Sequence, residues 1–159
     1  MITKTELIAA LRTAGTDVSS QLKGLPAESF DRLGDADGWT GKQHLAHIAS
    51  TEWTIPRLFD LAQADDAAQQ AAAAFDNHAY NAKQVGRRAA RTVGQLLEEF
   101  ETNRAATIAA IEAADESLLS LKVSSAGGVH GKLGRVLQYL CVEHVGDHLK
   151  EIHAGDPAR

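Results

Sequence analysis

Two histidines four residues apart, His144 and His148, have the residue type and spacing of a metal-binding pair. On an α-helix their side chains lie one turn apart on the same face, so both imidazoles can reach one ion. Apolar residues at helical spacing share that face: Leu137, Leu140, Cys141 and Ile152. We therefore expect both imidazoles to point into the protein. An unpaired buried ring nitrogen would cost about 1–3 kcal/mol there, and a shared cation would remove that cost.

A third imidazole is available nearly a hundred residues earlier, in the segment 39–48 with the sequence WTGKQHLAHI. His47 is the candidate third ligand, and His44, one turn before it, is an alternative. Three imidazoles leave a position open on a tetrahedral ion, as in catalytic zinc sites. We expect several of the other histidines to lie at the surface, among them His78, His130 and His153.

Composition places the chain among ordinary globular proteins and excludes several functions. Its 159 residues predict a single domain, 1–159, with one core. The formal charge of -5 provides no basic surface for nucleic acid, and we interpret the cluster of Arg87, Arg88 and Arg91 as solvated. The single cysteine, Cys141, excludes an intrachain disulfide and fits a reducing cytoplasm. There is no export signal and no run of 18 apolar residues, so we expect neither secretion nor membrane insertion.

Hydrophobic periodicity predicts four long helices, at about 3–22, 40–64, 92–114 and 132–153. Three of them begin with the spacing of a capping box, in which a threonine side chain and a Glu or Gln three residues later cap each other's backbone N–H groups. These pairs are Thr3 with Glu6, Thr40 with Gln43, and Thr92 with Gln95. Pro56 should kink the second helix, and Gly155 and Pro157 should end the last one.

The connecting segments are expected to contain little regular structure. Residues 65–91 are rich in alanine but poor in large apolar side chains, which predicts a long crossover with helical pieces. A turn-rich loop through Asp35–Gly38 contains at most one short helical turn, around Ala27–Leu33. The run 127–131 is interpreted as a plain loop, and the alternating run 119–123 as an unpaired segment rather than a strand. The sequence therefore predicts an all-α four-helix bundle with a long crossover between its second and third helices.

The two histidine-containing segments resemble the motifs of the DinB/YfiT-like superfamily. The segment 39–48 is similar to that superfamily's tryptophan-led second-helix motif, and His144-x-x-x-His148-x-x-x-Ile152 is similar to its last-helix motif. The start Thr3-Lys4-x-Glu6-Leu7 and the crossover run Asp76-x-x-x-Tyr80-Asn81 also resemble members, so the likeness extends over nearly the whole chain.

This resemblance implies an up-down-down-up bundle, usually a homodimer, with a divalent metal held by His47, His144 and His148. Zn²⁺ and Ni²⁺ are the favoured ions, although spacing alone does not select the metal. Trp39 would be a structural residue. The superfamily includes thiol-dependent transferases and isomerases, such as mycothiol-dependent maleylpyruvate isomerase, together with proposed hydrolases and toxin-resistance proteins. The chain ends at Arg159, which predicts a protein without the appended C-terminal domain of the larger mycothiol enzymes.

The leading functional hypothesis is a metal-dependent enzyme that activates a low-molecular-weight thiol, or water, for attack on a small electrophile. Glu143 and Asp147 flank the candidate ligands and would be outer partners or solvated charges. Glu52 lies about 140° around its helix from His47, which makes it a poor general base, and no catalytic residue is assigned.

Two alternatives stay open. The bundle could sequester a toxic small molecule without efficient turnover, or it could be a helical dimer whose histidines bind no metal.

Overall fold

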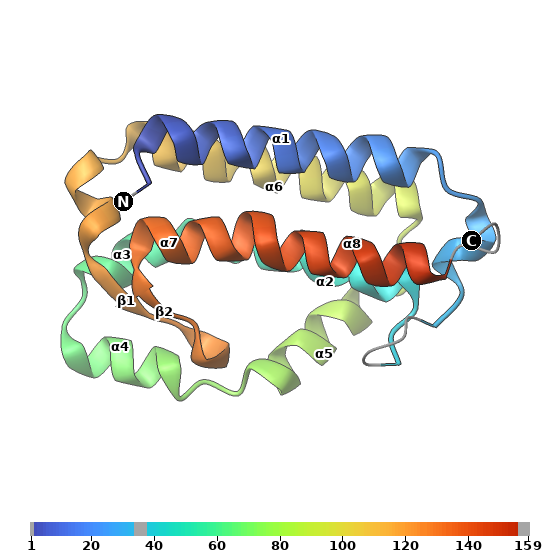
Figure 1. The fold of residues 1–159 in the computed structure, drawn as a ribbon. Helices are drawn as coiled ribbons and strands as arrows, with labels where there is room; N and C mark the ends of the chain where they lie inside the picture. The colour runs from blue at the N-terminus through green and yellow to red at the C-terminus, as the bar shows by residue number, and fades with distance from the viewer. Residues whose placement is uncertain (1, 34–37, 156–159) are drawn as a thin grey trace.

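The structure is a computed structural model that describes residues 2–33 and 38–155. It is a bundle of four long helical segments, and the prediction of an all-α four-helix bundle is confirmed. The segments are α1 (Lys4–Lys23), α2 (Gly41–Thr54) continued by α3 (Arg57–Gln63), α6 (Val93–Ala113), and α7 (Leu133–Gln138) continued into α8 (His144–Ala154). In chain order they run up, down, down and up, so the second and third segments point the same way (Figure 1). The predicted features at residues 34–37 and at Pro157 lie outside the described residues.

The starts of three helices follow from local chemistry. Each of the three predicted capping boxes is formed, with the threonine accepting from the third helical N–H and the Glu or Gln accepting from the threonine N–H: Thr3 with Glu6, Thr40 with Gln43, and Thr92 with Gln95. Pro56 interrupts the second segment as predicted, because α2 ends at Thr54 and α3 begins directly after the proline.

The crossover between α3 and α6 contains two short helices, α4 (Asp66–Ala73) and α5 (Asn77–Arg87), as the interpretation of helical pieces anticipated. None of the α4 residues is buried, whereas α5 packs against α2 through Val85. Arg88 also fixes this end of the crossover, because its guanidinium lies 2.6 Å from the carboxylate of Glu99 on α6. The interpretation of Arg88 as a solvated surface residue was therefore wrong.

A small hairpin replaces the plain loop predicted at 127–131. Strand β1 (Lys122–Ser124) pairs antiparallel with β2 (His130–Lys132), and Val123 lies opposite Gly131. The strands are three residues each, too short to produce a periodic signal, and the alternating run beginning at Leu119 finds its partner only after a glycine-rich turn. The hairpin packs against α3, α4 and α7 below the bundle (Figure 1).

The sequence predicts one uniform α-helix at 132–153, but the structure shows that this segment is interrupted. Between α7 and α8, Tyr139–Glu143 form a π-helical turn, which accommodates one extra residue just before His144. The residues of α8 buried in the core are Val145, Leu149 and Ile152, and the two histidines lie beside this apolar stripe rather than in its centre. His144, directly after the π turn, lines a cavity beside the core.

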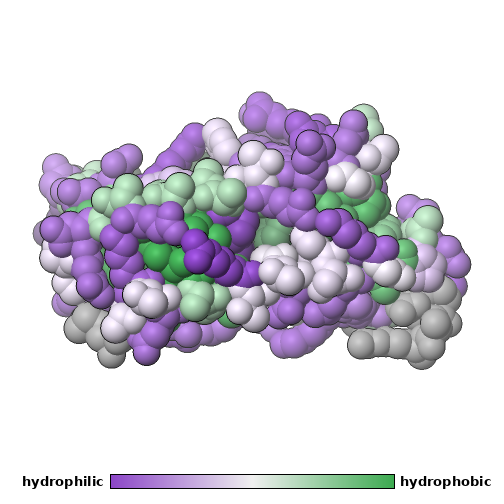
Figure 2. All heavy atoms as spheres, turned by 90° about the horizontal axis from the view of Figure 1, so that it is seen from above, coloured by the Kyte–Doolittle hydropathy of each residue, from purple (hydrophilic) through white to green (hydrophobic). Residues whose placement is uncertain are grey.

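The interior consists of two apolar clusters, one at each end of the bundle. One includes Leu22, Leu45, Phe100 and Ile152, and the other includes Leu7, Ile55, Ile111 and Leu137. A buried ion pair lies where the clusters meet: Arg104 on α6 is 4% exposed and Glu52 on α2 is 1% exposed. Seen from the side of α1 and α6, the surface is mostly hydrophilic (Figure 2). None of the described helices is long and apolar enough to cross a membrane.

Arg104 connects three other segments of the bundle. Its Nε and Nη2 each lie 2.9 Å from a carboxylate oxygen of Glu52. Its Nη2 also donates to the carbonyl of Cys141 in the π turn at 2.8 Å, and its Nη1 donates to the carbonyl of Leu11 on α1 at 3.0 Å. Burial raises the pKa of Glu52, although Arg104 opposes that shift. One guanidinium thus fixes α1, α2 and the π turn relative to α6.

We expect Arg104→Leu to lower the free energy of unfolding by about 3–5 kcal/mol, because Glu52 would keep its buried carboxylate and lose its partner. Urea denaturation at neutral pH measures the change. The double variant Glu52→Leu/Arg104→Leu should lose less than Arg104→Leu alone. Arg12→Leu is the matched control, since Arg12 pairs with Glu112 at the surface and its loss should cost about 0–1 kcal/mol. Equal losses in the two arginine variants would contradict a structural role for the buried pair.

Candidate metal site

The packing of α2 against α8 brings three imidazoles together. His47 Nε2 lies 3.3 Å from His144 Nε2, although the two residues are 97 positions apart in the chain. His148 Nε2 lies 3.1 Å from the same nitrogen of His144. One ring nitrogen from each of the three histidines lies within 4.8 Å of the other two. The structure therefore places all three predicted ligands around one point.

These separations suit a small divalent ion. With Zn–N bonds of about 2.0–2.1 Å and tetrahedral angles, two nitrogen ligands lie about 3.3 Å apart. The two Nε2 separations at His144 are close to that value. All three candidate donors are imidazole nitrogens, a ligand type that Zn²⁺ and other divalent transition-metal ions accept. The residues present fit a bound metal ion.

Electrostatics keep these imidazoles in the form that binds metals. Burial, together with the neighbouring His148, His144 and His44, lowers the pKa of His47 to about 2. Burial also lowers the pKa of His144, against the opposing effect of Asp147. A neutral imidazole has a lone pair to donate, whereas an imidazolium has none. Both rings are therefore available as ligands at neutral pH.

The other acidic residues that were considered lie elsewhere. Glu143 forms an ion pair with Arg135, and Asp147 lies 2.7 Å from Lys150, both at the surface. Both are surface charges, and Asp147 also acts on His144 by raising the pKa of that imidazole. Glu52 is held by Arg104 in the bundle interior, as its position on the helix indicated. Of the remaining histidines, His78 and His130 are exposed and His153 is half-buried.

Two aromatic residues of the second-helix motif surround His47. The Trp39 ring lies edge-on to the rings of His47 and His44, with centroids 5.2 and 5.7 Å away. His44 is fully buried, and its Nδ1 lies 2.8 Å from His148 Nδ1, on the side of His148 opposite the shared point. His44 therefore does not replace His47 in the cluster but stands behind His148. Trp39 packs against the site, consistent with a structural role.

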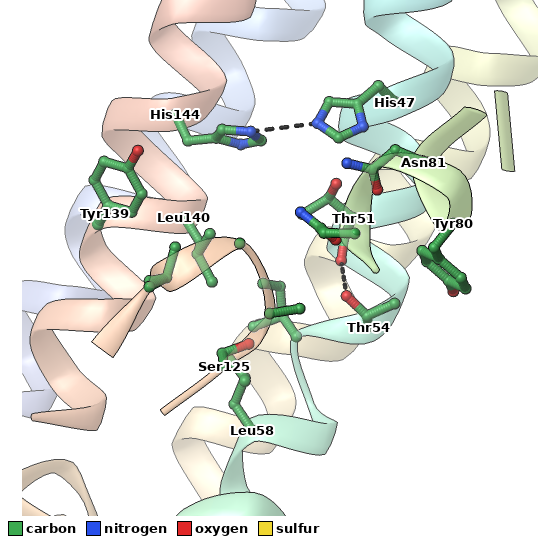
Figure 3. A pocket seen from close by; sticks show the side chains of 15 residues that line it. His47, Thr51, Thr54, Leu58, Tyr80, Asn81, Ser125, Tyr139, Leu140 and His144 are labelled. Carbon is green, nitrogen blue, oxygen red and sulfur yellow. Dashed lines mark hydrogen bonds between the residues drawn. The ribbon is translucent and has the colours of Figure 1, made fainter. Parts of the chain in front are cut away.

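A cavity of about 220 Å³ opens beside the cluster, with His47 and His144 in its wall. Figure 3 shows these two histidines facing each other from α2 and α8, with Tyr80 and Asn81 of α5 on one side and Tyr139 on the other. Thr51 and Thr54 continue the wall along α2. No Asp, Glu, Lys or Arg is among the described residues that line it. The wall is built from hydroxyl, amide and apolar groups.

The hairpin turn closes one side of the cavity, through Ser125, Ala126 and Gly127. Gly127 has φ 71°, in the left-handed region that favours glycine. A Cβ on Gly127 would lie 2.9 Å from Asn77 Nδ2, so a larger residue there would displace the end of the Asn77 side chain. The sequence interpretation missed this wall because the hairpin itself was missed. Tyr80 and Asn81 were noted as a crossover motif, but their sequence positions did not reveal that they line the same cavity as His47 and His144.

The fold and the site together define a class of protein. It is a four-helix bundle in which three imidazoles converge beside a cavity lined by uncharged groups. A scan against family models matched residues 11–148 to the mycothiol maleylpyruvate isomerase N-terminal domain. The chain belongs to this family, which is part of the DinB/YfiT-like superfamily, so the predicted relationship is confirmed. Comparisons with curated proteins and with solved structures found no match.

The depressed pKa of His47 predicts how the stability of the metal-free protein depends on pH. The ordinary histidine pKa is 6.5, so below that pH the unfolded chain takes up a proton that folded His47 does not bind. The free energy of unfolding should then fall by up to about 1.4 kcal/mol per pH unit as the pH decreases from 6.5 toward about 2.

Urea denaturation of chelator-treated protein between pH 7.5 and 5 measures this slope. His47→Gln should show a shallower slope than the wild type, and the exposed His78→Gln should keep the wild-type slope. Identical slopes in wild type and His47→Gln would contradict a neutral, buried imidazole at position 47.

Proposed function

We propose that the protein is a divalent-metal-dependent enzyme that activates a low-molecular-weight thiol, or else water, for attack on a small electrophilic substrate. The observation that carries the proposal is the convergence of ring nitrogens from His47, His144 and His148 beside a cavity that His47 and His144 line. His47, His144 and His148 would hold the ion, with Zn²⁺ and Ni²⁺ favoured. A divalent ion bound there would lower the pKa of a thiol or water and supply a nucleophile at neutral pH.

The composition of the cavity wall supports this chemistry. Because no charged side chain among the described residues lines the cavity, the site offers no carboxylate to serve as a general base. A nucleophile already deprotonated at neutral pH needs none. The chain's own contribution would be to hold the substrate against the imidazole cluster and to orient it through Thr51, Tyr80 and Asn81.

A thiol is favoured over water for two reasons. The family is named for an enzyme that uses mycothiol, and the polar groups of the wall are hydroxyls and amides. Such groups suit an uncharged ligand portion that is itself rich in hydroxyls and amides, because each can both donate and accept hydrogen bonds. From the family resemblance we also propose a homodimer, and from the single cysteine, Cys141, we propose a reducing cytoplasm as its location.

The first test is metal content. The purified protein should bind one equivalent of Zn²⁺ or Ni²⁺, measured by elemental analysis and by competition with a chelating dye. His47→Ala and His148→Ala should each weaken binding by about a hundredfold or more, since even outer partners of metal ligands contribute about 10–100-fold. His78→Ala should bind like the wild type. Wild-type affinity in His148→Ala would support the alternative of a helical protein without a metal centre.

The second test addresses turnover and the cavity. A screen of low-molecular-weight thiols against electrophiles should show metal-dependent consumption of the electrophile. Asn81→Leu removes a polar group from the wall, which would leave a hydrogen-bonding group of the substrate unpaired. We expect kcat/KM to fall by about 5–100-fold while the zinc content stays unchanged. The control is Gln70→Leu, which removes an exposed amide on α4 outside the cavity and should keep the wild-type kcat/KM. Saturable binding of electrophile without product would favour sequestration.

A further inference from the structure

We propose that His44 is a positioning residue that holds His148 in the one tautomer able to bind a metal through Nε2. The inference rests on the proposed function, because it concerns how the metal site is prepared. His44 is not among the three histidines whose ring nitrogens converge. It would partner the second ring nitrogen of His148, a position that a carboxylate or a backbone carbonyl usually takes in metal-binding histidines.

The position of His44 follows from the start of α2. The capping box at Thr40 fixes the first turn of the helix, and the backbone N–H of His44 donates to the Thr40 carbonyl at 3.0 Å. The side chain is fully buried and meets His148 through the two Nδ1 atoms, 2.8 Å apart. The ring centroids are 5.0 Å apart. His148 thus contacts His44 through one ring nitrogen and His144 through the other.

A hydrogen bond between two neutral imidazoles requires one nitrogen to donate and the other to accept. If His148 Nδ1 carries the hydrogen, it donates to His44 Nδ1, and the Nε2 lone pair of His148 faces His47 and His144. If instead His44 Nδ1 donates, His148 must carry its hydrogen on Nε2, and that nitrogen cannot bind a metal. When His44 Nδ1 accepts this hydrogen bond, His148 Nε2 has a lone pair available for a metal. When His44 Nδ1 donates it, His148 Nε2 has none.

The observed partner of His148 Nδ1 is an imidazole nitrogen, at 2.8 Å. Glu143 and Asp147, on the same helical segment, form ion pairs with Arg135 and Lys150 at the surface. A cation held through His148 Nε2 would require the arrangement in which His148 Nδ1 donates and His44 Nδ1 accepts. In that arrangement His44 fixes the tautomer and the ring orientation of His148, as outer partners do in other histidine metal sites.

The variants His44→Leu and His44→Asn separate positioning from packing. Leucine fills the buried space but accepts no hydrogen bond, whereas the Oδ1 of asparagine can take the place of the ring Nδ1 as acceptor. With Zn²⁺ as the probe, affinity measured by chelator competition should fall about 10–100-fold in His44→Leu and recover to within about threefold of wild type in His44→Asn. His153→Leu, on the same helix as His148, should bind like the wild type. Circular dichroism of the metal-free variants checks their folding.

A second measurement does not depend on variants. In ¹⁵N-labelled, zinc-loaded wild-type protein, two-bond correlations of the histidine rings should show His148 protonated at Nδ1 and His44 unprotonated at Nδ1. A protonated His44 Nδ1 would overturn the inference, as would wild-type affinity in a folded His44→Leu variant. If the wild type itself binds no Zn²⁺, the proposed function fails; if it binds and His44→Leu binds equally well, only the role of His44 fails.

Discussion

The buried pair of Arg104 and Glu52 is the constraint on which the geometry of the site depends. Glu52 follows His47 on α2, and the carbonyl of Cys141 that Arg104 binds lies one turn before His144. The same guanidinium therefore sets α2 and the π turn at a fixed height relative to α6 and, through Leu11, to α1. Apolar packing alone would allow helices to slide along one another, whereas a buried charge with directional hydrogen bonds does not. The register that places His47 opposite His144 follows from this contact and from the two apolar clusters on either side of it.

The parts of this structure that could be predicted from sequence are those governed by local chemistry. Capping boxes at Thr3, Thr40 and Thr92 fixed the starts of three helices, because a threonine and a glutamate or glutamine three residues apart satisfy backbone groups within one turn. The spacing of His144 and His148 predicted their common face for the same reason. Choosing His47 rather than His44 as their partner depended on the family resemblance, since no local rule relates two helices separated by almost a hundred residues.

The parts that were missed depend on contacts distant in the chain. The π turn at Tyr139–Glu143 has no sequence signature of its own and is accompanied by a hydrogen bond from Arg104, which lies on another helix. The hairpin of β1 and β2 consists of strands too short for periodicity, yet its turn closes the cavity beside the histidines. His44 was considered only as an alternative ligand, because sequence spacing cannot tell which ring nitrogen faces which neighbour. These three features together shape the surroundings of the imidazole cluster.

The account rests on one ion held by imidazoles from α2 and α8, and X-ray absorption at the zinc edge of the loaded protein tests it most directly. It predicts three imidazole nitrogens at about 2.0 Å, with the multiple-scattering pattern of histidine rings, and one sulfur at about 2.3 Å after addition of a thiol that the protein uses. A spectrum with one histidine or none, or one dominated by oxygen ligands and unchanged in His47→Ala, would show that the three rings meet without holding a metal.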